Sequence, residues 1–173
     1  LCLERMLAMP DVRLGVITHE PIERFPAKLR AALGGHYRVG DCLDPANLIT
    51  ACRAFREEWG RVDRLIGFLE QMQEALAAAR EAVGIPGMKA AAASNFRDKN
   101  RMKAVLRAAG LPVARQKLIR SAADALSFIE EVGYPVVLKP PAGMGSKNTV
   151  RVTSPEELYL SLIHISEPTR QPC

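Results

Sequence analysis

The segment of residues 133–152 constrains the fold of this chain more than any other part of its sequence. It contains an apolar run at 136–138, then Lys139, then a glycine-rich turn at 143–146, and then a second stretch at 148–152 that returns the chain. A β-branched apolar run of this kind buries as a strand. We therefore predict a hairpin whose first strand places Lys139 where the chain leaves the core.

The turn of this hairpin is suited to binding phosphate. Gly143 and Gly145 allow backbone conformations that residues with a Cβ resist, and they let main-chain N–H groups approach an anion closely. Together with Lys139 they favour a polyphosphate partner. Glycine hairpins are also common for purely structural reasons, so this segment alone leaves a structural turn open. The sequence has no Gly-x-x-x-x-Gly-Lys-Ser/Thr run and no Gly-x-Gly-x-x-Gly run, which excludes two other phosphate loops.

The residues around the hairpin resemble the ATP-grasp superfamily in order and spacing. In that family an Asp-Lys pair opens a helix, an Ala-Gly-x-Pro break follows, and a capped helix ends in Gly-Tyr-Pro. A strand ending in Lys-Pro then leads into a glycine-rich loop. The corresponding residues here are Asp98-Lys99, Ala109–Pro112, Gly133–Pro140 and Gly143–Ser146. The similarity extends broadly to carboxylate-amine ligases, carbamoyl phosphate synthase and biotin carboxylase.

The resemblance implies that ATP is the cofactor and assigns a role to five residues. Lys139 would hold the α- and β-phosphates, and Lys99 would be the second lysine that contacts the nucleotide. Gly143, Gly145 and Ser146 would cover the β- and γ-phosphates. A lysine that contacts a phosphate forms a charge-assisted hydrogen bond, so its loss is expected to weaken ATP binding severely.

The lysines also have structural interpretations. Lys99 opens a helix with an apolar stripe, so it could be a solvated lysine on a packed helix. Lys103 lies one helical turn further on and is a weaker candidate for the role of Lys99. Lys139 stands at a strand end before Pro140, where a lysine is often merely solvated.

The first half of the chain alternates strand patterns with helix patterns. The strands are expected at 12–17, 37–39 and 62–68, and the helices at 26–33, after the capping residue Asp44, and at 72–83. This alternation favours a parallel sheet covered by helices. We predict an α/β fold with a Rossmann-like domain at residues 1–93, followed by the first, α+β lobe of an ATP-grasp domain at residues 94–159.

Glu70 directly follows the third expected strand. Ligands of open parallel sheets bind beyond the carboxyl ends of the strands, so Glu70 could face the active site. An exposed glutamate at a helix start explains this residue equally well, because acids favour that position.

Composition narrows the range of partners. The net charge is +5, but the basic residues are scattered among acids and aromatic residues make up only 5%, which argues against nucleic acid. No stretch approaches the roughly 20 apolar residues that span a bilayer. The four cysteines form no Cys-x-x-Cys pair, so they are expected to be reduced thiols and not zinc ligands. We expect a cytoplasmic protein that binds ATP and a small carboxylate substrate.

The end of the chain differs in character. Ser154 to Glu157 is a helix start, with a capping serine, a proline and a glutamate three residues after the cap. Residues 160–173 then resemble the translation of an adapter used to prepare DNA for sequencing. We expect this tail to be foreign to the protein, and for that reason His164 is not a candidate ligand or base.

The resemblance implies a parent enzyme that uses ATP and Mg²⁺ to activate a carboxylate as an acyl phosphate for attack by an amine or similar nucleophile. In the family a second lobe carries the Mg²⁺ ligands. We expect that lobe to lie beyond this chain, which by itself is then inactive. A turn with only two glycines, Gly143 and Gly145, favours a peptide-forming or amino-acid ligase. Two alternatives are a non-catalytic nucleotide-binding module and a flavodoxin-like interaction domain in the first half.

Overall fold

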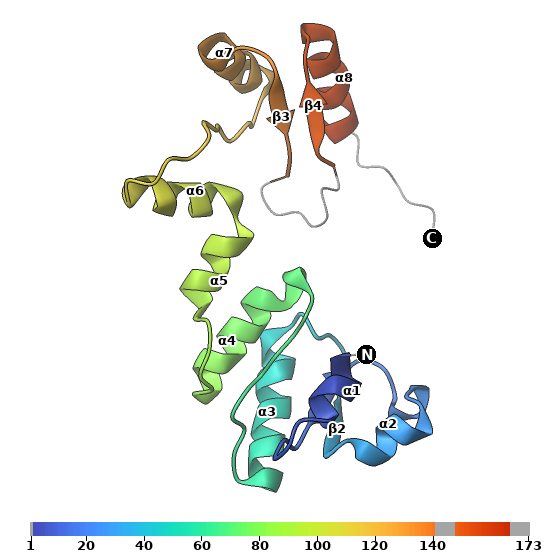
Figure 1. Ribbon diagram of the computed structural model, residues 1–173. Coiled ribbons are helices and arrows are strands. Elements are labelled where there is room, and N and C mark those ends of the chain that lie inside the picture. Colours follow the sequence, from blue (N-terminus) through green and yellow to red (C-terminus); the bar gives the residue numbers. More distant parts are fainter. Residues whose placement is uncertain (1, 141–147, 167–173) are drawn as a thin grey trace. The chain divides into compact units, whose positions relative to one another are not determined.

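The structure is a computed structural model that describes residues 2–140 and 148–166 (Figure 1). The chain divides into two compact units, residues 1–94 and residues 95–173. Helices occur together with one parallel and one antiparallel strand pair in the described residues, so the predicted α/β fold class is confirmed. Within these residues no helix combines the length and the apolar character needed to cross a membrane.

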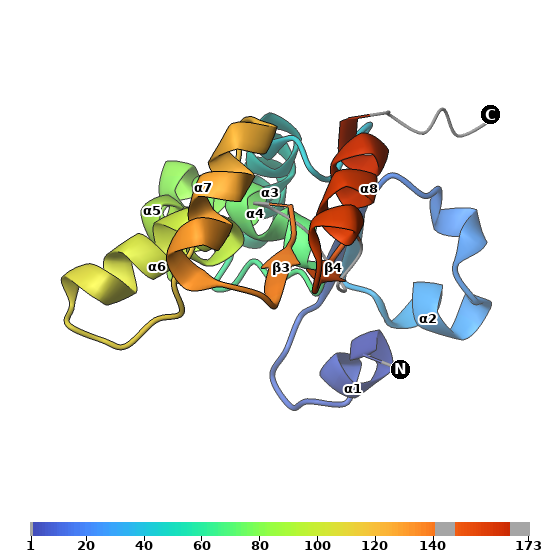
Figure 2. The same ribbon diagram turned by 90° about the horizontal axis from the view of Figure 1, so that it is seen from above.

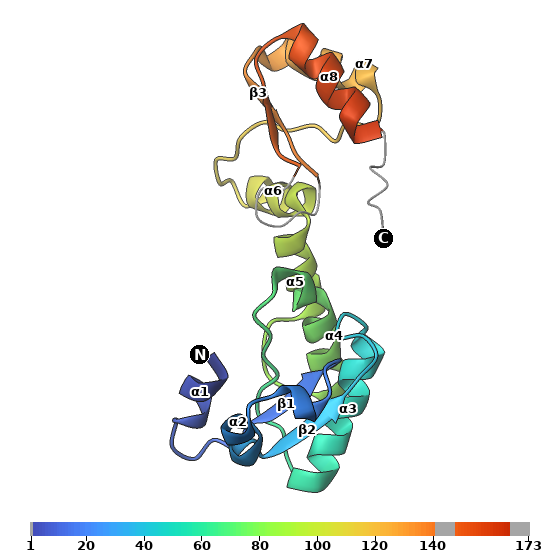
Figure 3. The same cartoon turned by 90° about the vertical axis from the view of Figure 1, so that its right-hand side faces the viewer.

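The first unit has a strand–helix–strand arrangement followed by longer helices. Its elements are α1 (Cys2–Leu7), β1 (Gly15–Thr18), the 3-10 helix η1 (Ile22–Arg24), α2 (Ala27–Ala32), β2 (Gly35–Arg38), α3 (Pro45–Trp59), the 3-10 helix η2 (Glu70–Met72) and α4 (Gln73–Val83). Helix α5 (Ala90–Arg97) spans the boundary to the second unit. Strands β1 and β2 pair in parallel, with Gly15 opposite Gly35. Figure 3 shows these strands side by side, with α3 next to them.

Two glycines allow the aromatic end of α3 to lie against the parallel strands. The rings of Phe55 and Trp59 stack at a centroid distance of 4.5 Å. A Cβ on Gly15 would lie 2.5 Å from Trp59, and a Cβ on Gly35 would lie 2.7 Å from Phe55. Because real Cβ atoms do not approach other atoms so closely, only glycine fits at these two strand positions.

Helix α3 begins as its sequence predicts and contributes Leu48 and Cys52 to the two buried clusters of the first unit. The Asp44 side chain accepts a hydrogen bond from the backbone N–H of Ala46 at 2.9 Å, and Pro45 occupies the first helical position. Apolar residues of α3 then pack against α4 and the segment after it. The buried members of these two clusters are Leu48, Cys52, Ala75, Leu76, Ala79, Val83 and Ile85.

The predicted strand at 62–68 is wrong. This segment is not part of a strand, because side chains of α4 take backbone carbonyls that a neighbouring strand would otherwise bind. Arg80 donates two hydrogen bonds to the carbonyl oxygen of Leu65, at 2.9 and 2.8 Å, and Gln73 donates one to Gly67 at 3.1 Å. Two apolar side chains of this segment are exposed, Ile66 at 53% and Phe68 at 65%.

The second unit is built around a short antiparallel hairpin. Its further elements are α6 (Lys99–Ala108), α7 (Ala122–Val132), β3 (Val136–Leu138), β4 (Val150–Val152) and α8 (Pro155–Ser166). The predicted pairing of the two strands is confirmed, with Val136 opposite Val152. Figure 2 shows α7 beside β3 and α8 beside β4. The buried core between them consists of Ala125, Val136, Val152 and Leu158.

The two helices that flank the hairpin begin at side-chain caps. At α7, Ser121 Oγ accepts from the backbone N–H of Asp124, whose carboxylate accepts from the N–H of Ser121, and together they form a capping box. The Asp124 carboxylate also accepts a hydrogen bond from the backbone N–H of Arg120. The hydrogen bonds to this carboxylate, that from Arg120 first, lower the pKa of Asp124. At α8, Ser154 Oγ accepts from the backbone N–H of Glu157 at 3.3 Å.

Helix α8 continues to Ser166 and so enters the segment 160–173 that we predicted to be foreign. A helix does not identify the origin of a sequence, and that prediction stays a prediction. The domain boundaries expected at residues 93 and 159 likewise stay predictions.

The contact between β2 and α3 is open to a direct test. We expect Gly35→Ala to lower the free energy of unfolding by about 1–3 kcal/mol, because its methyl group would overlap Phe55 and Trp59. Urea unfolding followed through Trp59, the chain's one tryptophan, measures the loss. Gly40→Ala is the matched control, since a Cβ there meets nothing within 4 Å. Equal stability of the two variants would contradict this packing.

Candidate functional site

The hairpin of the second unit fixes the position of Lys139. Val136 is buried in the core with Val152, and Leu138 is the last residue of β3. Lys139 follows at once, and its side chain is exposed. The strand therefore delivers an ammonium group to the edge of the core, as the sequence predicts.

Helix α6 places three further cations on one helical face. Its N-cap is Asp98, whose carboxylate accepts from the backbone N–H groups of Asn100 and Arg101 at 2.7 and 3.0 Å. This cap makes Lys99 the first residue of the helix. The other two cations follow at intervals of four residues, which places them one above the other on the helix. They are Lys103 and Arg107.

The connection between α6 and α7, residues 109–121, lies against α6 through two hydrogen bonds. Lys103 Nζ donates to the carbonyl oxygen of Ala114 at 3.2 Å. Gln116 Nε2 donates to the carbonyl oxygen of Lys99 at 3.5 Å. Lys103 is therefore a contact between the helix and the connection as well as a charge on the helix surface.

The charge of Lys139 contributes to the electrostatics of Lys103. Burial lowers the pKa of Lys103, and the positive charges of Lys139 and then Arg107 lower it further. Among the described residues, none of the ion pairs includes any of these three cations. A group of cations without a paired carboxylate is a site to which an anion is attracted.

The predicted roles of the site residues stay predictions, and the structure shows where the described ones lie. Lys103, the weaker candidate, is the helical lysine in electrostatic contact with Lys139. Lys99 is half-buried at the start of α6. Its predicted role stays a prediction. Glu70 begins η2 in the first unit and is exposed, which leaves both of its interpretations open.

Gly143, Gly145 and Ser146 lie outside the described residues. Their assignment to the β- and γ-phosphates also stays a prediction. The described part of the chain holds no group of three or more His, Cys, Asp and Glu side chains that could bind a metal ion.

Arg107 is a further cation of α6 that the sequence analysis did not single out. The signal was available, because Arg107 lies four residues after Lys103 on a helix already predicted from its apolar stripe. It was overlooked because the family motif points only to the beginning of that helix.

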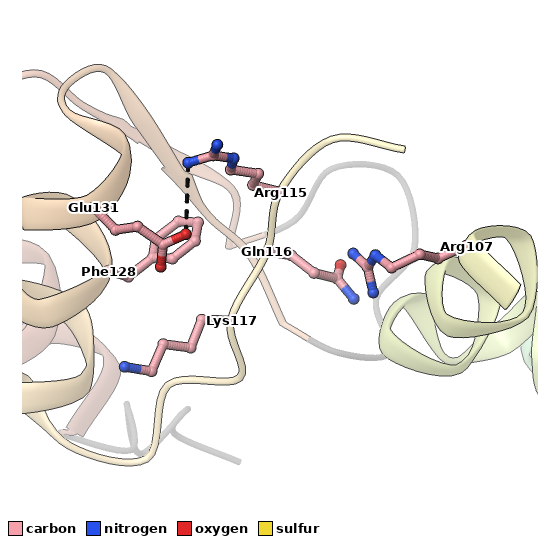
Figure 4. Close-up of a pocket in the computed structure, with 6 residues that line it drawn as sticks. All are labelled: Arg107, Arg115, Gln116, Lys117, Phe128 and Glu131. Atoms are coloured by element: carbon pink, nitrogen blue, oxygen red, sulfur yellow. Dashed lines mark hydrogen bonds and ion pairs between the residues drawn. The ribbon is translucent and has the colours of Figure 1, made fainter. Parts of the chain in front are cut away.

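An open hollow of about 340 Å³ lies on the side of Arg107 that faces the connection (Figure 4). Its lining residues are Arg107, Arg115, Gln116, Lys117, Phe128 and Glu131. Several of these polar groups bond within the unit. Arg115 pairs with Glu131 at 3.5 Å, and Lys117 Nζ donates to Ser127 Oγ at 3.2 Å. These contacts account for the polar lining without a ligand.

The sequence of the second unit matches a known family. Residues 88–143 match the family described as ATP-grasp domain. The chain is 37% identical to an alanine–anticapsin ligase of Bacillus subtilis over 65 residues, which are 38% of this chain and 14% of that protein. It is 36% identical to a D-alanine–D-alanine ligase of Pseudomonas fluorescens over 80 residues, which are 45% of this chain and 25% of that protein.

Solved structures show the same fold over most of the chain. An L-amino acid ligase from Bacillus licheniformis superposes with a TM-score of 0.67 and 22% identity, covering 90% of this chain and 36% of that one. The biotin carboxylase domain of a 2-oxoglutarate carboxylase from Hydrogenobacter thermophilus superposes with a TM-score of 0.72 and 24% identity. It covers 94% of this chain and 37% of that one.

Residues 88–143 therefore belong to an ATP-grasp domain, and the family recognised from the sequence motifs is confirmed. Lys99, Lys103 and Lys139 all lie within this segment. The chain spans 14% and 25% of the length of the two curated relatives described above.

The proximity of Lys103 and Lys139 leads to a measurable shift. We expect Lys139→Gln to raise the pKa of Lys103, because the substitution removes one of the positive charges that lower it. NMR of lysine side chains across an alkaline pH titration measures this shift. Arg101→Gln, on the same helix but not among the causes of the lowered pKa, is the control. An unchanged Lys103 pKa in the Lys139 variant would show that the two ammonium groups are not close.

Proposed function

We propose that this chain is the ATP-binding part of an ATP-dependent ligase. The parent reaction would activate a carboxylate as an acyl phosphate, which an amine or a similar nucleophile then attacks. The observation that carries the proposal is the match of residues 88–143, which include Lys99, Lys103 and Lys139, to an ATP-grasp domain. Lys139 and Lys103 come from separate elements, the charge of Lys139 contributes to the lowered pKa of Lys103, and neither is ion-paired within the described residues; cations of this kind suit a polyphosphate.

The proposed binding mode follows from the chemistry of the lysine side chain. The Lys139 ammonium would donate hydrogen bonds to oxygens of the α- and β-phosphates, and Lys99 would provide the second lysine contact to the nucleotide. Each ammonium group has three hydrogen-bond donors and no acceptor. Phosphate oxygens accept such hydrogen bonds, whereas an apolar ligand offers no acceptor. Gly143, Gly145 and Ser146 would cover the β- and γ-phosphates from the turn that follows Lys139.

The names of the relatives support a ligase that joins a carboxylate to an amine. Two are ligases of alanine and one is an L-amino acid ligase. The proposed substrate is accordingly a small carboxylate, with an amino acid preferred.

Mg²⁺ would accompany ATP in the parent reaction. When bound with ATP it neutralises charge on the phosphates during phosphoryl transfer. We assign Mg²⁺ no ligand among the described residues, because these hold no group of three or more His, Cys, Asp and Glu side chains that could bind a metal ion. The chain alone is accordingly proposed to bind ATP without turning it over.

The second candidate is a non-catalytic nucleotide-binding module that regulates or scaffolds a partner. The lack of a metal-binding group in the described residues is compatible with this function as well. A steady-state assay of the parent protein separates the two. ATP consumption that depends on an added amino acid supports the ligase, and nucleotide binding without consumption supports the module.

The role of Lys139 provides the test. We expect Lys139→Met to weaken ATP binding by about 10- to 100-fold, which corresponds to the loss of one charge-assisted hydrogen bond of roughly 1.5–3 kcal/mol. Titration calorimetry of the full chain with ATP and Mg²⁺ measures this change. Lys117→Met is the matched control, because Lys117 bonds to Ser127 and is expected to leave the affinity unchanged. A wild-type chain without saturable ATP binding, or an unaltered affinity in the Lys139 variant, would contradict the proposal.

A further inference from the structure

The connection between α6 and α7 offers an unpaired backbone at residues 113–119. This segment belongs to neither a helix nor a strand, and among the described residues none of its N–H groups donates to another backbone group. Its place is nonetheless fixed, because Ala114 and Gln116 bond to α6 and Ile119 packs against the hairpin core. A backbone that is held in place with its hydrogen-bonding groups open can pair with a strand from another chain.

Side chains of this segment point to alternate sides, as they do along an extended backbone. Figure 4 shows Arg115 and Lys117 on the side toward α7, and Gln116 on the opposite side, toward Arg107 of α6. Arg115 and Lys117 therefore form a pair of cations on one side of the connection, at a spacing of two residues. In a paired strand, the residues that lie opposite these two cations are also two positions apart.

The hollow around this segment gathers positive charge. Among the described residues that line it, Glu131 is the only carboxylate beside three cations, which are Arg107, Arg115 and Lys117. The wider surface has the same sign, since residues 97–120 contain eight Lys and Arg and a single acid, Asp98, which caps α6. Clustered charge of one sign attracts a ligand of the opposite sign.

The contacts inside the hollow leave these cations able to bind a ligand. Arg115 and Glu131 are 3.5 Å apart with side chains 69% and 65% exposed, and a surface ion pair of this kind contributes little stability. The hydrogen bond from Lys117 to Ser127 uses one of three N–H donors. Arg107 takes part in none of the ion pairs among the described residues. The lining is thus satisfied without a ligand and can exchange partners at small cost.

The chemistry of the hollow favours a peptide over other anions. At about 340 Å³ and open to solvent, it suits a few side chains of a larger partner better than an enclosed small molecule. Glu131 repels phosphate, and Phe128 is the single aromatic ring among the described lining residues, whereas single-stranded nucleic acids stack on several rings. A peptide also supplies N–H and C=O groups to which the open backbone of residues 113–119 can bond.

We propose that residues 113–119 and the hollow bind an acidic segment of a partner protein in extended conformation. The backbone of that segment pairs with the connection, and its carboxylates at alternate positions contact Arg115 and Lys117. A further carboxylate contacts the guanidinium of Arg107, whose planar fork of donors matches a carboxylate. The proposal is independent of the ATP site, because it uses neither Lys99 nor Lys139.

Fluorescence anisotropy of labelled octapeptides with the full chain tests the class of ligand. One peptide alternates glutamate and valine, and the second contains the same residues with all glutamates in one block. We expect saturable binding of the alternating peptide and weaker binding of the block peptide, because only the first presents carboxylates along one side of a strand. Equal affinities would indicate general charge attraction and overturn the proposal. Tighter binding of a uridine oligonucleotide than of either peptide would overturn it in favour of nucleic acid.

Matched charge reversals test the place of binding. Arg107→Glu is expected to weaken binding of the alternating peptide by about tenfold, because it replaces an attraction by a repulsion. Arg101→Glu changes the net charge equally on the same helix but does not line the hollow, so a much smaller loss is expected. Lys117→Glu is a second variant in the hollow and is expected to behave like Arg107→Glu. Circular dichroism shows that each variant is folded. Equal losses in the control and in the two hollow variants would contradict this site.

Hydrogen exchange tests the pairing of the two backbones. Saturating alternating peptide is expected to slow the exchange of amides in residues 113–119, and unchanged exchange would overturn the pairing.

A peptide titration at saturating ATP and Mg²⁺ separates this inference from the proposed function. We expect the peptide to bind equally with and without nucleotide, whereas displacement by ATP would place the peptide at the phosphate site and refute a site in the hollow. A chain that binds ATP but not the peptide would refute this inference and leave the proposed function intact.

Discussion

The second unit depends on the burial of one cross-strand pair, Val136 and Val152. Both side chains lie in the core between α7 and α8, and Val152 has no exposed surface. A strand of three residues has too few backbone hydrogen bonds to be stable by itself, so this apolar contact holds it in place. The position of Lys139 at the end of β3 follows from that burial.

The candidate site arises where this hairpin and helix α6 bring like charges together. The Asp98 cap sets the phase of α6, which puts Lys99, Lys103 and Arg107 on one face. Charges of one sign repel, so such a cluster lowers the stability of the chain unless an anion compensates it. These cations lie in a segment that matches an ATP-grasp domain, and a bound ATP would be the anion that compensates them.

Much of the fold could be predicted because its signals are local. The caps at Asp44, Asp98 and Ser121 each correspond to a helix that begins at the next residue. The apolar run at 136–138 became strand β3 for the same reason, although only Val136 of the three is buried. Long-range contacts were harder, because a strand needs a partner that its own residues do not specify. The run at 62–68 lacks one, and Arg80 and Gln73 on α4 bind two of its carbonyls instead.

The order of importance of the candidate lysines also depends on long-range contacts that the sequence does not specify. The family motif singles out Lys99 at the start of the helix, and the sequence cannot tell which turn of that helix faces the end of β3. In the structure the charges of Lys139 and then Arg107 contribute to the lowered pKa of Lys103. The position of Lys139 depends on how the hairpin packs against α7 and α8, and that of Lys103 on its hydrogen bond to Ala114. Neither contact is visible in the sequence.

A lysine side-chain NMR titration with ATP tests the phosphate site most directly. The full chain would carry isotope-labelled lysines, with the signals of Lys103, Lys139 and Lys117 assigned by single substitutions. A site made by Lys103 and Lys139 predicts saturable shifts of these two signals at one common dissociation constant, while the Lys117 signal stays in place. Equal small shifts of all three signals, or none at saturating nucleotide, would contradict a phosphate site between α6 and β3.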